Sequence, residues 1–473
     1  MIFSSYSFLF IFFPIALLGY HLLRRTGRIA WVKLWLVAAS LVFYGVGQLD
    51  FLPWFAATIV LNYLFLLGIR RGNTLIVKRI WLILAVLWNL GLLFYFKYFN
   101  FMLSNINWIF KRNIPLIQVI LPIGISFFTF QILAFVVSFY REECDFPKLL
   151  DFAVFVTFFP QLIVGPVVRH EEVMPVIQGE RLLRFDTACI PKGVMLFSIG
   201  CAKKILLADT MTAYAASFYG GNVAEFSFVA TWIAVFCYVF SYYFDFSGYI
   251  DMARGLGYLF GIELPINFDS PYKARNFSDF WRRWNMTISR FFHESVFSNL
   301  FGFGDGIPRL ILATLATFLV SGLWHGAAWH YIFWGLANGL LVCVSNIRAL
   351  KDRKPLPGWL AVAMTFLVGA LTRVLFDCVG MTQAVQIYRK MLDLRNLIHV
   401  RTLLYSCLTF AQEHLVLILV LAVSAVICFC LPNSNRITDR EEFGWKDAAF
   451  SGVLLTMSLF YMTKVSTFLY FNF

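Results

Sequence analysis

Two polar side chains, Asn285 and His325, have types and surroundings that suit proton transfer and the stabilisation of an oxyanion. Asn285 ends the charged stretch FSDFWRRWN at 277–285, whereas His325 is almost the only polar group in a strongly apolar stretch. An ionisable side chain at membrane depth is costly and by default indicates a functional site. Burial favours the neutral imidazole, which can accept a proton, and an asparagine amide can donate to an oxyanion. The two residues therefore predict a functional site inside a membrane.

His325 also has a purely structural interpretation, because a buried histidine can form a hydrogen bond to a neighbouring helix only for packing. Gly322 and Gly326 flank it and remove side-chain bulk where a ligand could approach. A helix rises about 1.5 Å per residue, so the apolar stretch 310–344 is too long for a single span. The glycines therefore predict a break between two helices near His325. His330 lies at a different angle around the helix, so the two histidines do not predict a metal site.

The charged stretch itself predicts an amphipathic helix over 278–294, with Ser278 as its N-cap. At about 100° per residue, four residues share one polar stripe: Ser278, Arg282, Asn285 and Ser289. Asp279, Arg283, Arg290 and Glu294 occupy a different face. Such a helix either lines a polar cavity or lies at the membrane surface. Periodicity alone leaves both interpretations open.

A second group of polar residues lies in YFDFSGYID at 243–251. Its two carboxylates, Asp245 and Asp251, lie within or beside an apolar span. They either help to line a polar cavity or pair with arginines such as Arg254. Tyr243 and Asp245 are the members of this group that we include in the candidate site.

The composition shows which kind of fold must position these residues. Hydrophobic residues make up 60% of the chain and charged residues only 14%, whereas an average soluble chain carries roughly 25% charged residues. Several apolar runs of about 18 or more residues predict an all-α polytopic membrane protein with about 10–12 transmembrane helices. The segment FPQLIVGP at 159–166 is too interrupted by proline and glycine to span, which predicts re-entrant segments. No repeat or long linker divides residues 1–473, so we expect a single membrane domain.

Charge and cysteine content exclude several other classes of protein. The net charge of +13 is expected from Lys and Arg on cytoplasmic loops and requires no nucleic-acid partner. The nine cysteines are scattered, without the spacing of a disulfide framework or a zinc site. We therefore expect no nucleic acid and no metal.

Motifs along almost the whole chain resemble those of the membrane-bound O-acyltransferase (MBOAT) family. They are LPIGISFFTFQ at 121–131, FFPQL at 158–162 with GP at 165–166, YFDFSGY at 243–249, NF at 267–268 with PY at 271–272, FSDFWRRW at 277–284, and WHGA at 324–327 with WG at 334–335. The combination of FSDFW and WHG is highly specific. The strongest resemblance is to the bacterial branch that includes the alginate O-acetyltransferase membrane subunit.

The resemblance implies a helical bundle around a funnel or tunnel, with His325 as the catalytic histidine. Bacterial polysaccharide-modifying members usually carry histidine where this chain has Asn285, a residue that can orient a ring or stabilise an oxyanion. Arg282 and Arg283 would neutralise the phosphates of the acyl donor. The remaining candidates for substrate or donor binding are Ser278, Asp279, Tyr243, Asp245 and Trp324.

The function implied by the resemblance is O-acetylation of an extracytoplasmic polysaccharide. The chain would bind no cofactor, use acetyl-CoA or another acyl donor as co-substrate, and pass the acyl group across the bacterial inner membrane as a multi-pass protein among membrane lipids. Its partners would be the glycan acceptor and an exported acetyltransferase or esterase-like protein. Alternatives are D-alanyl or lipid acyl transfer by the same fold, or a non-catalytic acyl or glycan transporter. A transporter would be expected to contain inverted repeats, which the sequence does not show.

Overall fold

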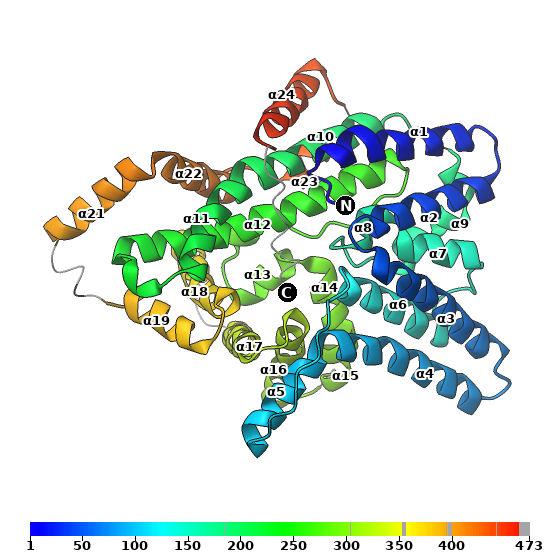
Figure 1. Cartoon of the computed structure of the whole chain (residues 1–473), viewed down its shortest axis with the longest axis horizontal. Helices are drawn as coiled ribbons and strands as arrows, with labels where there is room; N and C mark the ends of the chain where they lie inside the picture. Colours follow the sequence, from blue (N-terminus) through cyan, green and yellow to red (C-terminus); the bar gives the residue numbers. More distant parts are fainter. Residues whose placement is uncertain are drawn as a thin grey trace. The chain divides into compact units, whose positions relative to one another are not determined.

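The structure is a computed structural model, and it describes residues 1–184, 186–302, 304–351, 356–393, 395, 400–440 and 442–462. The described residues form helices joined by loops (Figure 1), which confirms the all-α polytopic membrane fold. Backbone contacts group the chain into two compact units. Among the described residues, unit 1 comprises those of Met1–Cys201, Tyr249–Pro265 and 442–462, and unit 2 those of Ala202–Gly248 and Ile266–Arg440. The expected single domain and the funnel or tunnel stay predictions.

Fewer described helices reach spanning length than the 10–12 expected. Six are long and apolar enough to cross a membrane: Leu49–Arg71, Leu75–Phe110, Phe228–Leu259, Ile307–His325, Trp329–Leu350 and Gly358–Asp377. A seventh span results if the bent pair Arg401–Glu413 and Leu415–Phe429 is counted as one. Other apolar runs form shorter helices, such as Ile29–Gly45 and Ile125–Tyr140. A run of apolar residues indicates that the segment avoids water. It does not require that the segment forms one straight helix of about 20 residues.

Unit 1 contains the N-terminal helices and the last described helix. Its helices are η1 (Phe8–Phe12), α1 (Phe13–Arg24), α2 (Ile29–Gly45), η2 (Leu49–Phe51), α3 (Leu52–Arg71), α4 (Leu75–Leu93), η3 (Phe94–Tyr98), α5 (Phe99–Phe110), α6 (Ile125–Tyr140), α7 (Leu149–Thr157), α8 (Phe159–Leu162), α9 (His170–Gln178), η4 (Glu180–Leu182), α10 (Cys189–Ala202, with its last residue in unit 2) and α24 (Trp445–Tyr461). The interrupted segment 159–166 forms only the short α8 and is buried throughout. Irregular backbone is tolerated at membrane depth when protein surrounds it.

Two buried polar pairs connect helices within unit 1. Lys33 on α2 forms an ion pair with Asp151 on α7. The amides of Asn62 on α3 and Asn89 on α4 bond reciprocally, with Nδ2–Oδ1 distances of 3.2 and 2.6 Å. Each pair satisfies its own polar groups between two packed helices, as burial in an apolar environment requires.

Unit 2 contains all the residues of the candidate site. Its helices are η5 (Lys203–Ala208), α11 (Asp209–Gly220), η6 (Val223–Glu225), the first part of α12 (Phe228–Leu259), η7 (Pro271–Lys273), α13 (Phe277–Arg283), α14 (Met286–Phe292), η8 (His293–Phe297), α15 (Ser298–Leu300), α16 (Ile307–His325), α17 (Trp329–Leu350), α18 (Gly358–Asp377), α19 (Met381–Met391), α21 (Val400–Glu413), α22 (Leu415–Phe429) and α23 (Ser434–Thr438). Helices α16 and α17 form a hairpin, and α17 also packs on α13 and α18 (Figure 1).

Candidate active site

The helix break predicted near His325 is present. Helix α16 ends at His325, and α17 begins at Trp329 after a short connection. The glycines beside the histidine serve packing and not ligand access: a Cβ on Gly322 would lie 2.4 Å from the carbonyl oxygen of Tyr331, and one on Gly326 would lie 2.0 Å from its ring. Because both positions lack a side chain, α16 and α17 approach closely. The hairpin therefore fixes where His325 lies.

Aromatic rings surround the His325 imidazole. Its centroid lies 5.0 Å from the ring of Trp334 on α17 and 5.0 Å from the ring of Phe376 on α18, both edge-on. The neighbouring Trp324 is also buried, with its ring 4.6 Å from the imidazole and 5.9 Å from Phe292. Only 7% of His325 is exposed. Rings from three helices thus restrict how the imidazole can turn.

The predicted continuous helix over 278–294 is wrong, because the chain breaks at Asn285. Helix α13 ends at Arg283, and Asn285 has a φ of 44°, in the left-handed region. Asparagine adopts this conformation more readily than most residues. The predicted N-cap Ser278 is also wrong: Asn276 is the cap, and its Oδ1 accepts from the Asp279 amide at 2.8 Å. Periodicity missed the break because it assumes one unbroken helix.

The break turns the Asn285 side chain into a buried network, with only 2% of the residue exposed. Asn267 donates from Nδ2 to Asn285 Oδ1 at 3.0 Å. The Oδ1 atom of Asn267 in turn accepts from the amide and the hydroxyl of Thr287, each at 3.0 Å. These bonds assign Asn285 Oδ1 as an acceptor, so its Nδ2 is the donor that a ligand can use.

A continuous series of rings connects Asn285 to His325. Trp284, the residue before Asn285, stacks on Tyr242 of α12 at 6.0 Å and 8°. Tyr242 lies 5.7 Å from Phe376, which contacts His325. In unit 2, ring contacts therefore join His325 to Trp284, the residue that precedes Asn285 at the helix break.

The four candidates on α13 lie in different surroundings. Arg283 donates from Nε to Asp279 at 2.7 Å and also contacts Asp269, so it holds the loop before α13. Ser278 donates to Asn346 of α17 at 2.6 Å. Arg282 is exposed. Of these four, only Arg282 presents its charge freely at the surface.

The two candidates on α12 are buried in a polar cluster. Lys204 of the π-helical turn η5 forms ion pairs with Asp245 at 2.6 Å and with Asp209 at 2.8 Å. Asp245 therefore pairs with a lysine from another helix. Tyr243 lies beside Asp245 in sequence, and its ring is 6.1 Å from Trp284 and 6.0 Å from Lys203 Nζ. Sequence reasoning missed Lys204, although two adjacent lysines in an apolar run were a visible signal.

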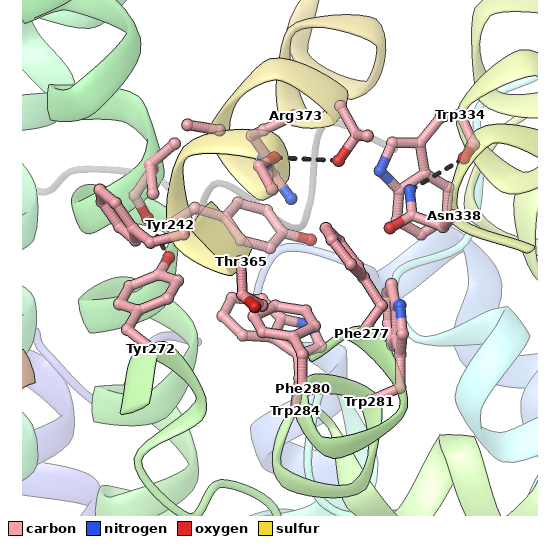
Figure 2. A pocket seen from close by; sticks show the side chains of 15 residues that line it. Tyr242, Tyr272, Phe277, Phe280, Trp281, Trp284, Trp334, Asn338, Thr365 and Arg373 are labelled. Carbon is pink, nitrogen blue, oxygen red and sulfur yellow. Dashed lines mark hydrogen bonds between the residues drawn. The ribbon is translucent and has the colours of Figure 1, made fainter. Parts of the chain in front are cut away.

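A pocket of about 50 Å³ lies beside the aromatic cluster. Figure 2 shows Arg373, Trp334 and Asn338 on one side of it and Tyr272, Phe280, Trp281 and Trp284 on the other. The hydroxyl of Tyr272 donates to the carbonyl of Val239 at 2.7 Å. Burial raises the pKa of Tyr272 well above its ordinary value, so this hydroxyl stays protonated. The lining suits a small, largely apolar group with one polar end.

Arg373 and Asp377 of α18 are residues of this region that the sequence analysis missed. Arg373 lines the pocket, and Asp377 pairs with it. The available signal was an opposite-charge pair four residues apart inside an apolar span. No group of three or more metal-ligating side chains occurs within the part of the chain that the structure describes.

An all-helical membrane fold with a buried histidine and a nearby buried asparagine defines a candidate intramembrane transferase. Comparison with known proteins identifies its class: the model of the membrane-bound O-acyltransferase family matches residues 51–354. The chain belongs to this family and is an O-acyltransferase. The matched region includes Asn285 and His325 but ends before Arg373.

Three relatives show which proteins this chain is similar to. It is 35% identical to the peptidoglycan O-acetyltransferase of Helicobacter pylori over 100% of this chain and 98% of that protein. It is 34% identical to the probable alginate O-acetylase AlgI of Pseudomonas aeruginosa, over 83% of this chain and 75% of that one. The teichoic acid D-alanyltransferase of Streptococcus thermophilus is 27% identical over 54% of this chain and 68% of its own.

Proposed function

We propose that this protein O-acetylates a cell-wall polysaccharide, with the glycan of peptidoglycan as the final acceptor. The observation that carries the proposal is the site: a buried histidine, and a buried amide donor whose neighbour Trp284 is joined to that histidine by ring contacts. The similarity to a peptidoglycan O-acetyltransferase along nearly the full length of both chains supports this acceptor. The protein acts in the bacterial inner membrane as a multi-pass protein in contact with lipid.

His325 acts as the general base. Its neutral imidazole takes the proton of an acceptor hydroxyl, and the hydroxyl oxygen attacks the carbonyl carbon of the acyl donor. Asn285 Nδ2 donates to the oxyanion that forms, and a donor in this role contributes about 2.7–4 kcal/mol in other enzymes. The intermediate collapses as the carbon–sulfur bond of a thioester donor breaks. The sulfur leaves as a thiolate, the imidazolium proton neutralises the leaving group, and the product is an ester.

The donor in this proposal is acetyl-CoA on the cytoplasmic side. Arg282, which is exposed, attracts the donor phosphates, because guanidinium groups bind phosphate oxygens well. Arg283 is already bound to Asp279 and Asp269, so its contribution is to hold Arg282 and α13 in place. An exported acetyltransferase or esterase-like partner completes the transfer to the polymer outside the membrane.

The experiment compares a bacterial strain lacking its own copy of this protein with the same strain carrying the wild-type chain or His325→Ala. Ester-linked acetate is released from purified peptidoglycan by mild base and quantified, and the amount of each protein in the membrane is measured. We expect acetate with the wild-type chain and only background with His325→Ala at equal protein level. Normal acetate with His325→Ala would refute the catalytic role.

The same strains also distinguish the alternatives. D-alanine esters on teichoic acid that depend on this chain would favour D-alanyl transfer, the activity named for relatives that match about half of the chain. Acylated lipid that depends on it would indicate a lipid acceptor. Movement of an acyl group or glycan that persists in His325→Ala would indicate a transporter.

A further inference from the structure

An ion pair lies within a single helix beside the catalytic cluster. Arg373 and Asp377 are four residues apart on α18, a helix long and apolar enough to cross a membrane. The guanidinium contacts both carboxylate oxygens, with Nε to Oδ2 at 3.0 Å and Nη2 to Oδ1 at 2.8 Å. The Asp377 side chain has no exposed surface, and 13% of the Arg373 side chain is exposed. The pair is thus an ion pair with one hydrogen bond, and it is largely buried.

The free faces of the guanidinium contact two rings. Its central carbon lies 3.4 Å from the centroid of the Tyr242 ring and 4.1 Å from that of Phe376. A planar cation stacked on aromatic rings is attracted to them, most strongly when water is excluded. Arg373 therefore holds together the two rings through which the aromatic cluster continues.

Each of these rings leads to one of the residues to which we assign a role in transfer. Phe376 contacts His325 edge-on at 5.0 Å. Tyr242 stacks on Trp284, which immediately precedes Asn285 in the chain. Arg373 itself is not among the residues with a ring contact to His325, so its effect on transfer must be indirect.

Stability alone does not account for this pair. Burying two charges costs several kcal/mol per ion before pairing, and apolar residues of similar volume often serve a fold equally well or better. A pair within one helix also connects no second helix through its own bond. Charged groups at membrane depth are expensive and are retained where they have a function.

We infer that Arg373, oriented by Asp377, is a positioning residue that keeps the rings beside His325 and Asn285 in the arrangement required for acyl transfer. This inference rests on the proposed function for the roles of His325 and Asn285. Asp377 fixes the plane of the guanidinium, and the guanidinium fixes Tyr242 and Phe376. Those rings then restrict the motion of the His325 imidazole and of the turn that contains Asn285.

The chemistry requires arginine and not merely a positive charge. A lysine at position 373 can pair with Asp377 through its ammonium group, but it has no planar group that contacts both carboxylate oxygens and both rings at once. Arg373→Lys therefore keeps the charge and removes the planar contact. This one substitution therefore separates the contribution of the positive charge from that of the planar contact with the rings.

The principal test replaces both charges at once, in the variant Arg373→Met/Asp377→Leu. No unpaired charge remains, so the protein is expected to fold and reach the membrane in normal amount. Initial rates of acetyl transfer from acetyl-CoA are measured with purified protein in detergent. We expect kcat to fall by about 100-fold, as for a misplacement of about 1 Å, with the KM for the donor unchanged.

The chain offers a matched control in unit 1. Lys33 and Asp151 form a buried ion pair with side-chain exposures of 7% and 5%. The variant Lys33→Met/Asp151→Leu removes an equivalent pair, and we expect kcat to stay at the wild-type value. A similar loss of kcat in both double variants would overturn the inference, because the effect would then be general.

Two further measurements keep the inference testable. The first serves if the double variant does not fold, and the second serves if the proposed function is wrong. Arg373→Lys is expected to lower kcat about as much as the double variant; a wild-type kcat would overturn the inference. Modification of His325 by diethyl pyrocarbonate, followed by mass spectrometry, requires no substrate. We expect faster modification in Arg373→Lys than in the wild type, because the ring is held less firmly. An unchanged modification rate would overturn the positioning role, whatever reaction the protein performs.

Discussion

Two buried ion pairs, one from each unit, differ in what they connect. Lys33 and Asp151 lie on different helices, α2 and α7, so their bond itself joins two elements of unit 1. Arg373 and Asp377 lie on the same helix of unit 2 and join nothing by their own bond. Instead, the guanidinium contacts rings from α12 and α18. Two ion pairs of similar chemistry therefore have different roles: the pair in unit 1 joins two helices, and the pair in unit 2 contacts aromatic rings.

The buried asparagines differ in the same way. Asn62 and Asn89 bond to each other, and both also bond to carbonyls of their own helices. Asn285 accepts one bond from Asn267 and has a donor directed elsewhere, at a left-handed turn. Polar groups that satisfy one another build the fold of unit 1. In unit 2 the Asn285 amide keeps a donor for a ligand, and the residue before it, Trp284, lines the pocket.

Removing one charge from either pair is the largest change that we predict for stability. Lys33→Met leaves Asp151 buried and alone, and Asp377→Leu does the same to Arg373. Each is expected to lower the free energy of unfolding by about 3–5 kcal/mol. Chemical unfolding of the purified variants in detergent measures this loss. If only one of the two variants were destabilised, the pairs would not be equivalent in burial cost.

Replacing the asparagine of the site should affect the rate and not the stability. Asn285→Gly keeps the left-handed turn, because glycine adopts a positive φ without strain, but removes the amide. We expect the transfer rate to fall by about 10²–10³-fold, or about 2.7–4 kcal/mol, as for loss of an oxyanion donor. The rate is measured at equal amounts of folded protein. A wild-type rate would remove Asn285 from the catalytic residues.

The matching change in unit 1 should affect stability and not the rate. Asn62→Ala deprives Asn89 of its amide partner at a buried position. A buried polar group left without a partner costs about 1–3 kcal/mol. The unfolding midpoint should therefore fall while the rate per folded molecule stays unchanged. A lower rate would contradict the contrast between the two units.

The smallest effect is expected at Ser278, which bonds to Asn346 and connects α13 to α17. Ser278→Ala removes one hydrogen bond, typically worth about 0.5–1.5 kcal/mol. We predict a slightly lower unfolding midpoint and an unchanged KM for acetyl-CoA. A raised KM would instead place Ser278 in the donor site, as the sequence motif suggested.

The sequence predicts the class of fold and the break after His325, because apolar runs and flanking glycines are local features. It does not predict the break at Asn285, where a left-handed residue divides a stretch whose periodicity suits one helix. The ring contacts of His325 and the pairing of Asp245 with Lys204 join residues far apart in the chain. Such contacts depend on how helices pack, and the spacing of residues within one segment does not predict them.

The roles assigned to single residues also depend on this packing. Gly322 and Gly326 were visible in the sequence, but only the hairpin shows that they make room for Tyr331. Arg283 was predicted to neutralise donor phosphates, but in the folded chain it contacts Asp279 and, from the loop before α13, Asp269. Sequence motifs therefore located the site, and the folded chain determines which of its members face a substrate.

The central claim is that the imidazole of His325 performs the proton transfer. The most direct measurement is the initial rate of acetyl transfer from acetyl-CoA by purified wild-type protein and His325→Ala, at equal amounts of folded protein. General-base catalysis contributes about 10²–10⁴-fold, so we predict that the rate of His325→Ala falls by at least about 10²-fold. A rate equal to that of the wild-type protein would contradict the account.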